Sequence, residues 1–224
     1  MAERLIWFLF PRIVLASLIL TFGLWGLSQA DPHRTVTVPA LAVSLNGGHE
    51  HGGVHYIAIQ IDRDPQQRGP TILFNELSRG SAVGQDWKDG VHRAVAAAAA
   101  ELGEDQRNWT VTIKNSTYSS VTHGSSASSA VAVGIMAAWR GDRLYSDVVL
   151  TGEITPAGQI LEVGGLRGKM EGAAKGHMHT LLIPKGEASA VDFDLYKLAK
   201  EIQIKVIEVK SLREAYVHMT GKKP

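Results

Sequence analysis

Residues 146–176 read SDVVLTGEITPAGQILEVGGLRGKMEGAAKG, and this stretch predicts the architecture of the chain. The apolar run at 147–150 predicts a strand, TGEITPAG a turn, residues 159–163 a second strand, and residues 166–175 a helix. Downstream we expect a strand at TLLIP (180–184), a helix near 193–200, a strand at IKVIEV (204–209) and a helix from Ser211. Because strands and helices alternate, the fold class is predicted to be α/β.

The first half of the chain predicts a hairpin and one long helix. Residues 31–41 form a linker that turns into a strand, and VSLNGGHEHGGVHYIAIQID (43–62) gives two extended runs around a Gly-rich turn. A short strand follows at TILFNEL (71–77), then a helix over 83–102 that Gly103 ends, and a strand at WTVTIKNS (109–116). The folded domain should therefore cover 41–220, with 31–40 as its linker.

Composition excludes several classes of function. The 224 residues are 45% hydrophobic and 20% charged, which is typical of a globular protein, and the net charge of +1 leaves no electrostatic footprint for nucleic acid. With no cysteine, disulfides, thiolate catalysis and Cys-based zinc sites are excluded. Any catalytic residues must therefore be found among Ser, Thr, Lys, His and the carboxylates.

Residues 1–30 carry a targeting signal. Two arginines precede IVLASLILTFGLWGL (13–27), a run that suits either a transmembrane anchor or a signal peptide cleaved at about Ala30. Since the positive charges come first, the rest of the chain is expected outside the cytoplasm, either on a single-pass membrane helix or secreted or periplasmic after cleavage.

The stretch HGSSASSAVAVGIMAAW (123–139) places four serines at the start of an apolar helix. Serine is a favoured N-cap, which is one reading. The other reading is a nucleophile, because a helix N-terminus offers free N–H groups and the positive end of its dipole to an oxyanion. The segment alone leaves both open.

Lys169 stands out among the lysines, because it lies at a helix start between Leu166 and Met170, next to glycines. Apolar surroundings disfavour the ammonium form, so the pKa of such a lysine falls and the amine becomes a usable base. A snorkelling surface lysine is the alternative.

Two other patterns do not support a cofactor or metal. His49 and His51 at the Gly-rich turn lack a third ligand at metal-site spacing. GGLRGKM (164–170) lacks the glycine six residues before its lysine and the Ser or Thr after it that a phosphate-binding loop requires. We therefore expect no cofactor and no metal.

Together these motifs resemble the proteolytic domain of the Lon family of serine peptidases, from about Val43 to Val217. GSSAS (124–128) is similar to the nucleophile motif of the membrane-bound archaeal type and implies Ser126 as nucleophile. The T-G-E turn followed by a G-G-x-x-x-K helix implies Lys169 as the catalytic lysine and Thr151 as the threonine that hydrogen-bonds it. The resemblance implies the Lon proteolytic-domain fold.

The sequence departs from the archaeal pattern beside the nucleophile. His123 and Ser125 stand where that pattern has acidic residues, which predicts a less negative site and leaves the roles of both residues open. The histidine of the bacterial type aligns near Lys114 and is absent. Neither the AAA+ ATPase module of the family nor a Walker motif occurs in the 224 residues, so we expect hydrolysis independent of ATP.

The resemblance implies a serine endopeptidase with a Ser126–Lys169 dyad that acts on unfolded or flexible proteins and peptides. It also implies a homo-oligomeric ring, with a hexamer favoured. Two alternatives stay open: a catalytically idle binding or assembly module on the same fold, or the proteolytic partner of a separate ATPase.

Overall fold

The computed structural model describes residues 34–47, 49–76, 82–116, 121–190 and 193–224. Strand β1 begins at Arg34, inside the stretch expected to turn from linker into strand. The segment predicted to be an anchor or signal peptide, 1–30, lies outside the described residues. Within the described part of the chain, no helix combines the length and apolar character needed to cross a membrane.

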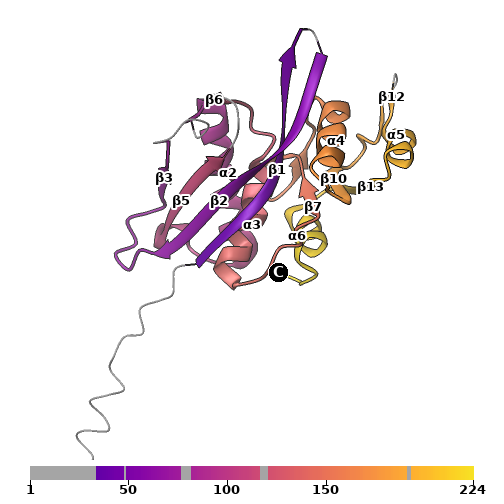
Figure 1. Ribbon diagram of the computed structural model, residues 1–224. Helices are drawn as coiled ribbons and strands as arrows, with labels where there is room; N and C mark the ends of the chain where they lie inside the picture. The colour runs from indigo at the N-terminus through magenta and orange to yellow at the C-terminus, as the bar shows by residue number, and fades with distance from the viewer. Residues whose placement is uncertain (1–33, 48, 77–81, 117–120, 191–192) are drawn as a thin grey trace, which may run out of the picture. The chain divides into compact units, whose positions relative to one another are not determined.

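A mixed seven-stranded sheet organises the fold, in the order β13-β10-β7-β1-β2-β5-β3. Only β2 runs antiparallel to its neighbours. The strands are β1 (Arg34–Asn46), β2 (His49–Arg63), β3 (Thr71–Phe74), β5 (Trp109–Ser116), β7 (Val148–Leu150), β10 (Thr180–Pro184) and β13 (Lys205–Val209). The α/β class is confirmed (Figure 1).

Three two-stranded pairs complete the strands. They are β4 (Ala82–Val83) with β6 (Val121–Thr122), β8 (Glu153–Ile154) with β9 (Ile160–Leu161), and β11 (Ser189–Ala190) with β12 (Phe193–Asp194). A 3-10 turn, η1 (Gln106–Asn108), precedes β5. The segment predicted as a turn, 151–158, contains strand β8, which pairs antiparallel with β9, and β9 is a shorter form of the strand predicted at 159–163.

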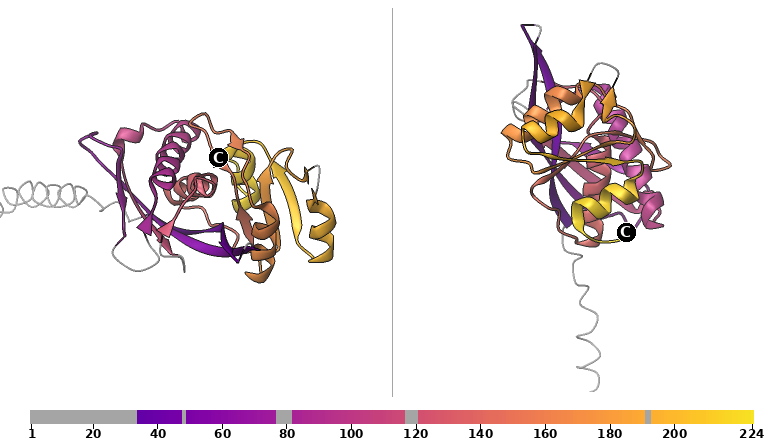
Figure 2. Two further views of the ribbon diagram at one scale, coloured as in Figure 1. Left: turned by 90° about the horizontal axis from the view of Figure 1, so that it is seen from above. Right: turned by 90° about the vertical axis from the view of Figure 1, so that its right-hand side faces the viewer.

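Helices cover both faces of the sheet (Figure 2). They are α2 (Gln85–Leu102), α3 (Ser128–Arg140), α4 (Leu166–Lys175), α5 (Leu195–Glu201) and α6 (Leu212–Thr220). Ala40 of β1 belongs to the apolar core under α2, α3 and α6, whereas the next residue, Leu41, belongs to the core under α4 and α5. Because successive side chains of β1 point to opposite faces of the sheet, this one strand contributes residues to two separate cores.

The structure tests two predictions about helix ends, the glycine stop after α2 and the serine cap before α3. Helix α2 ends as predicted at Gly103, whose φ of 67° is the left-handed conformation that glycine adopts without a steric penalty. Helix α3 begins only at Ser128, and its N-cap is Ala127, with no side-chain hydrogen bond at the cap. The interpretation in which one of the serines is the N-cap of this helix was therefore wrong.

The sheet divides at Ala40, and this division creates space for a site. β1 pairs with β7 only through Ala40 and Leu150, yet it stays paired with β2 as far as Asn46. The β1–β2 hairpin consequently extends beyond the other strands (Figure 1). Beyond Ala40, the edge of β1 that faces β7 has no strand partner among the described residues.

Candidate active site

A cavity of about 700 Å³ lies where the hairpin leaves the sheet. Its walls come from β1 and β2, from the start of α2, from the segment before α3 and from the segment leading into α4. Ser126 and Lys169 both line it. The fold thus brings together the two predicted residues, which are 43 positions apart in the sequence.

The backbone of Ser126 is fixed by the residues that follow β7. Its carbonyl oxygen accepts a hydrogen bond from the N–H of Gly152 at 2.8 Å and one from the hydroxyl of Thr151 at 3.4 Å. Thr151 is fully buried. The hydrogen bond that its hydroxyl makes therefore orients Ser126, and the contact with Lys169 that the family resemblance implied stays a prediction.

Free N–H groups are present at the start of α3. The N–H of Ser128 donates to the carbonyl of Ser125 at 2.9 Å, and that of Ser129 donates to Gly152 at 3.2 Å. Within the described part of the chain, the N–H groups of Ser126 and Ala127 donate no hydrogen bond. Such groups at a helix N-terminus suit an oxyanion.

Lys169 is held inside the protein at the first turn of α4, where its N–H bonds to the carbonyl of Gly165. Only 3% of the residue is exposed. Burial lowers the pKa of Lys169 to about 8, against the opposing effect of the Glu187 and Glu50 carboxylates. The expectation of a base made usable by its surroundings therefore has a physical cause in this structure.

Several carboxylates lie around the cavity. The nucleophile motif lacks its two carboxylates, but other parts of the chain supply negative charge around the cavity. Glu50, Glu153 and Glu162 line it, and Glu187 acts on Lys169 from beside it. The prediction that the site is less negative than the archaeal pattern, made from His123 and Ser125, stays a prediction, and these carboxylates are the negative charges that the structure itself places around Lys169.

Close backbone contact between β2 and α4 holds Lys169 in place. A Cβ on Gly52 would lie 1.7 Å from the carbonyl oxygen of Gly168, and one on Gly172 would lie 2.3 Å from the carbonyl carbon of Gly52. Gly52 lies within β2, not in the turn. The glycines therefore let the helix that carries Lys169 rest directly on the strand.

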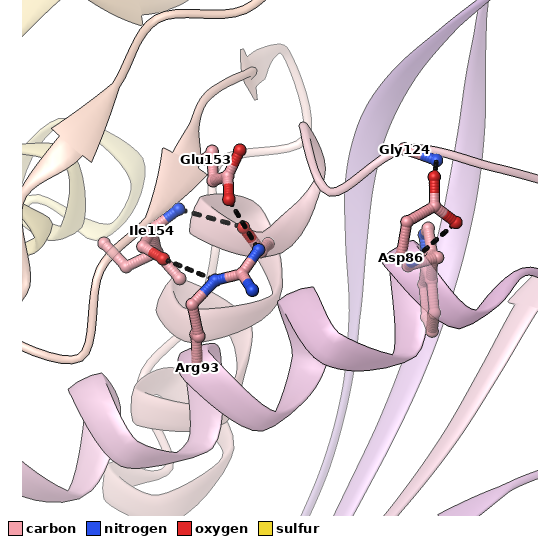
Figure 3. Close-up of polar contacts among 7 residues, drawn as sticks. Asp86, Arg93, Gly124, Glu153 and Ile154 are labelled. Carbon is pink, nitrogen blue, oxygen red and sulfur yellow. Dashed lines mark hydrogen bonds and ion pairs between the residues drawn. The ribbon is translucent and has the colours of Figure 1, made fainter.

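Helix α2 makes polar contacts with the segment before α3 and with the turn after β7 (Figure 3). At its first turn, a carboxylate oxygen of Asp86 accepts the N–H of Gly124 at 2.5 Å. Two turns later, Arg93 pairs with the Glu153 carboxylate at 2.6 Å and donates to the Ile154 carbonyl at 3.3 Å. One helix thus contacts both the segment before α3 and the turn after β7.

Sequence reasoning missed His55 and Trp87, which also line the cavity. His55 is 5% exposed, and burial lowers its pKa to about 4, so the ring is neutral at neutral pH. It shares a strand face with Ile57 and Ile59, both in the core. A polar residue on the apolar face of an alternating strand was the signal that could have found it.

Comparison with known proteins identifies the family. Residues 91–219, more than half of the chain, match the family described as Lon protease (S16) C-terminal proteolytic domain. The chain belongs to this family. The Lon match includes Ser126, Thr151 and Lys169, but it begins after β1, β2 and the first turn of α2.

Individual Lon relatives match over shorter stretches. Lon protease 1 of Syntrophobacter fumaroxidans is 36% identical over 85 residues, which is 38% of this chain and 10% of that protein. The Archaeal Lon protease of Archaeoglobus fulgidus is 31% identical over 139 residues, which is 61% of this chain and 22% of that protein. The Lon protease of Escherichia coli is 41% identical over 61 residues, which is 27% of this chain and 8% of that protein. The matched part is thus less than a quarter of the length of each of these relatives.

Proposed function

We propose that the chain is a serine endopeptidase that hydrolyses peptide bonds through Ser126 and Lys169. The observation that carries the proposal is a buried lysine with a pKa lowered to about 8 in the same cavity as a serine at a helix N-terminus. An amine with this pKa is neutral in a substantial fraction of molecules near pH 8, so it can accept a proton. Membership of a proteolytic-domain family supports the same conclusion.

In the proposed first half-reaction, the neutral amine of Lys169 takes the hydroxyl proton of Ser126 as Oγ attacks the substrate carbonyl carbon. The carbonyl π electrons move to oxygen, and the N–H groups of Ser126 and Ala127 stabilise the resulting oxyanion. When the tetrahedral intermediate collapses, the C–N bond breaks and the Lys169 ammonium gives its proton to the departing amine. The products are an acyl ester on Ser126 and a free amine.

The second half-reaction repeats these roles with water. Lys169, neutral again, removes a proton from a water molecule that attacks the ester carbonyl. Collapse of the second intermediate releases the carboxylic acid, and Lys169 returns the proton to Ser126. Thr151 and Gly152 support both steps because they fix the carbonyl of Ser126 and hence the direction of its side chain.

Three finer expectations belong to the same proposal. Hydrolysis should be unaffected by ATP and Mg²⁺, because the 224 residues contain no phosphate-binding loop. The family resemblance supports assembly into a ring, which light scattering of the purified chain would test. The apolar run at 13–27 supports attachment at a membrane with the domain outside the cytoplasm.

Hydrolysis of labelled casein by the full chain tests the proposal. Ser126→Ala should lower the rate by about 10³-fold or more, because the nucleophile and its base act as a unit. Ser125→Ala is the matched control, since Ser125 lines the same cavity one position earlier, and this variant should keep its rate within tenfold. Equal rates for wild type and Ser126→Ala would refute the proposal.

A further inference from the structure

The start of α2 contacts the segment that leads to Ser126. Asp86 lies in the first turn of α2, and its Oδ2 atom accepts the N–H of Gly124, 38 positions later in the chain, at 2.5 Å (Figure 3). Its other carboxylate oxygen, Oδ1, accepts the N–H of Trp87 at 2.9 Å and lies 3.7 Å from Nδ1 of His123. Each oxygen of this carboxylate thus accepts a backbone N–H, which fixes the direction of the side chain.

Gly124 is a residue whose conformation needs such a contact. Its φ of 85° lies in the region that glycine adopts without a steric penalty, and a Cβ there would have no atom within 4 Å. The glycine is therefore needed for its conformation and not for space. Against the opposing effect of burial, the N–H groups of Gly124 and Trp87 lower the pKa of Asp86. A hydrogen bond to an ionised carboxylate is stronger than one between neutral groups, so this contact can hold Gly124 in place.

The contact lies between two other fixed points of the same segment. Upstream, the carbonyl of Thr122 accepts the N–H of Gly84, the residue before α2, at 2.8 Å. Downstream, the carbonyl of Ser126 is held from the residues after β7. The proposed oxyanion donors, the N–H groups of Ser126 and Ala127, come two and three positions after Gly124. Their direction therefore depends on the backbone conformation at Gly124.

We propose that Asp86 is a positioning residue for the peptidase reaction, because its hydrogen bond to Gly124 sets the direction of Ser126 and of the oxyanion donors. This deepens the proposed function and rests on it. Asp86 does not line the cavity, so it acts through the backbone of Gly124 and not by contact with the substrate. Misplacement of a reacting group by about 1 Å can lower a rate by about 10²-fold. Loss of the hydrogen bond should therefore change kcat more than KM.

Steady-state hydrolysis of a fluorogenic casein-derived peptide by the full chain tests this role. Asp86→Ala should lower kcat by about 10- to 100-fold and leave KM within about twofold. Asp86→Asn keeps one acceptor oxygen, so its kcat should lie between those of Asp86→Ala and the wild type. Asp89→Ala is the matched control, because Asp89 is exposed on the same helix and its carboxylate accepts a hydrogen bond from the Gln85 side chain. This variant should keep the wild-type kcat.

Hydrogen exchange followed by mass spectrometry gives a second readout that does not require activity. In Asp86→Ala, the amides of residues 121–127 should exchange faster than in the wild type, while those of α3 and β5 keep their protection. A wild-type kcat in Asp86→Ala, an Asp86→Asn variant as slow as Asp86→Ala, or faster exchange across the whole domain would refute the positioning role. Absence of hydrolysis by the wild type would instead refute the proposed function, and hydrogen exchange would still test the contact with Gly124.

Discussion

The residues that match the Lon family and the residues that precede the match contribute differently to one site. The matched region, 91–219, holds Ser126, Thr151 and Lys169, the groups of the proposed reaction. The preceding region holds Glu50, Gly52 and His55, which add a carboxylate, a close backbone contact and a buried polar ring beside those groups. The other carboxylates of the site, Glu153, Glu162 and Glu187, belong to the matched region. The groups of the proposed reaction can thus be recognised by motif, while part of their surroundings comes from a hairpin that lies outside the match.

Removal of the base from the matched region should have the largest effect. Lys169→Met should lower casein hydrolysis by about 10³-fold, because the variant lacks the buried amine that accepts the Ser126 proton in the proposed reaction. Lys175→Met, an exposed lysine on the same helix, should retain the wild-type rate. Initial rates at pH 8.5 measure both. Comparable losses in the two variants would place the base elsewhere.

A change in the preceding region should break the site through packing. Gly52→Ala places a methyl group in the backbone of Gly168 and should lower the free energy of unfolding by about 3 kcal/mol, as α4 is forced off β2. Gly53→Ala is the control, because a Cβ there has no atom within 4 Å. Urea unfolding compares the two variants, and equal stability would show that the close contact is unimportant.

The buried amine should also reduce stability. Folding lowers the pKa of Lys169 from 10.5 to about 8, so the unfolded chain binds more protons between these pH values and wild-type stability rises across that range. Lys169→Met should lose this rise and gain on the order of 2 kcal/mol at pH 7. Unfolding curves of the wild type and of Lys169→Met at pH 7 and pH 10 test this prediction. A Lys169→Met variant less stable than wild type at pH 7 would contradict it.

The smallest effect should come from the hairpin carboxylate. Glu50 raises the pKa of Lys169, so Glu50→Gln should shift the acidic limb of the pH–rate profile to lower pH without lowering the plateau. Glu201→Gln, a change at an exposed residue of α5, should leave the limb in place. A shift to higher pH would mean that Glu50 does not act on Lys169 through its charge.

The sequence was informative where local pattern and chemistry coincide. Alternation and glycine stops located the hairpin, α2 and the strand–helix series after residue 146, and the family motifs pointed to two residues that line one cavity. The contributions of Glu187, Glu50 and His55 depend on long-range contacts between β2, α4 and the segment after β10. The contacts of Glu50 and Glu187 with the site leave no periodic signal, which is why the sequence did not predict these carboxylates there. His55, in contrast, could have been found from its place on the apolar face of β2.

Covalent labelling of Ser126 as a function of pH tests the central claim most directly. The rate at which a serine-directed phosphonate probe reacts with the full chain should rise with pH through a midpoint at about 8 and level off at higher pH, because only the neutral form of Lys169 activates the hydroxyl. In Lys169→Met, labelling should be slow and almost independent of pH over the same range. Labelling of Lys169→Met at the wild-type rate, or modification of a serine other than Ser126, would contradict the account.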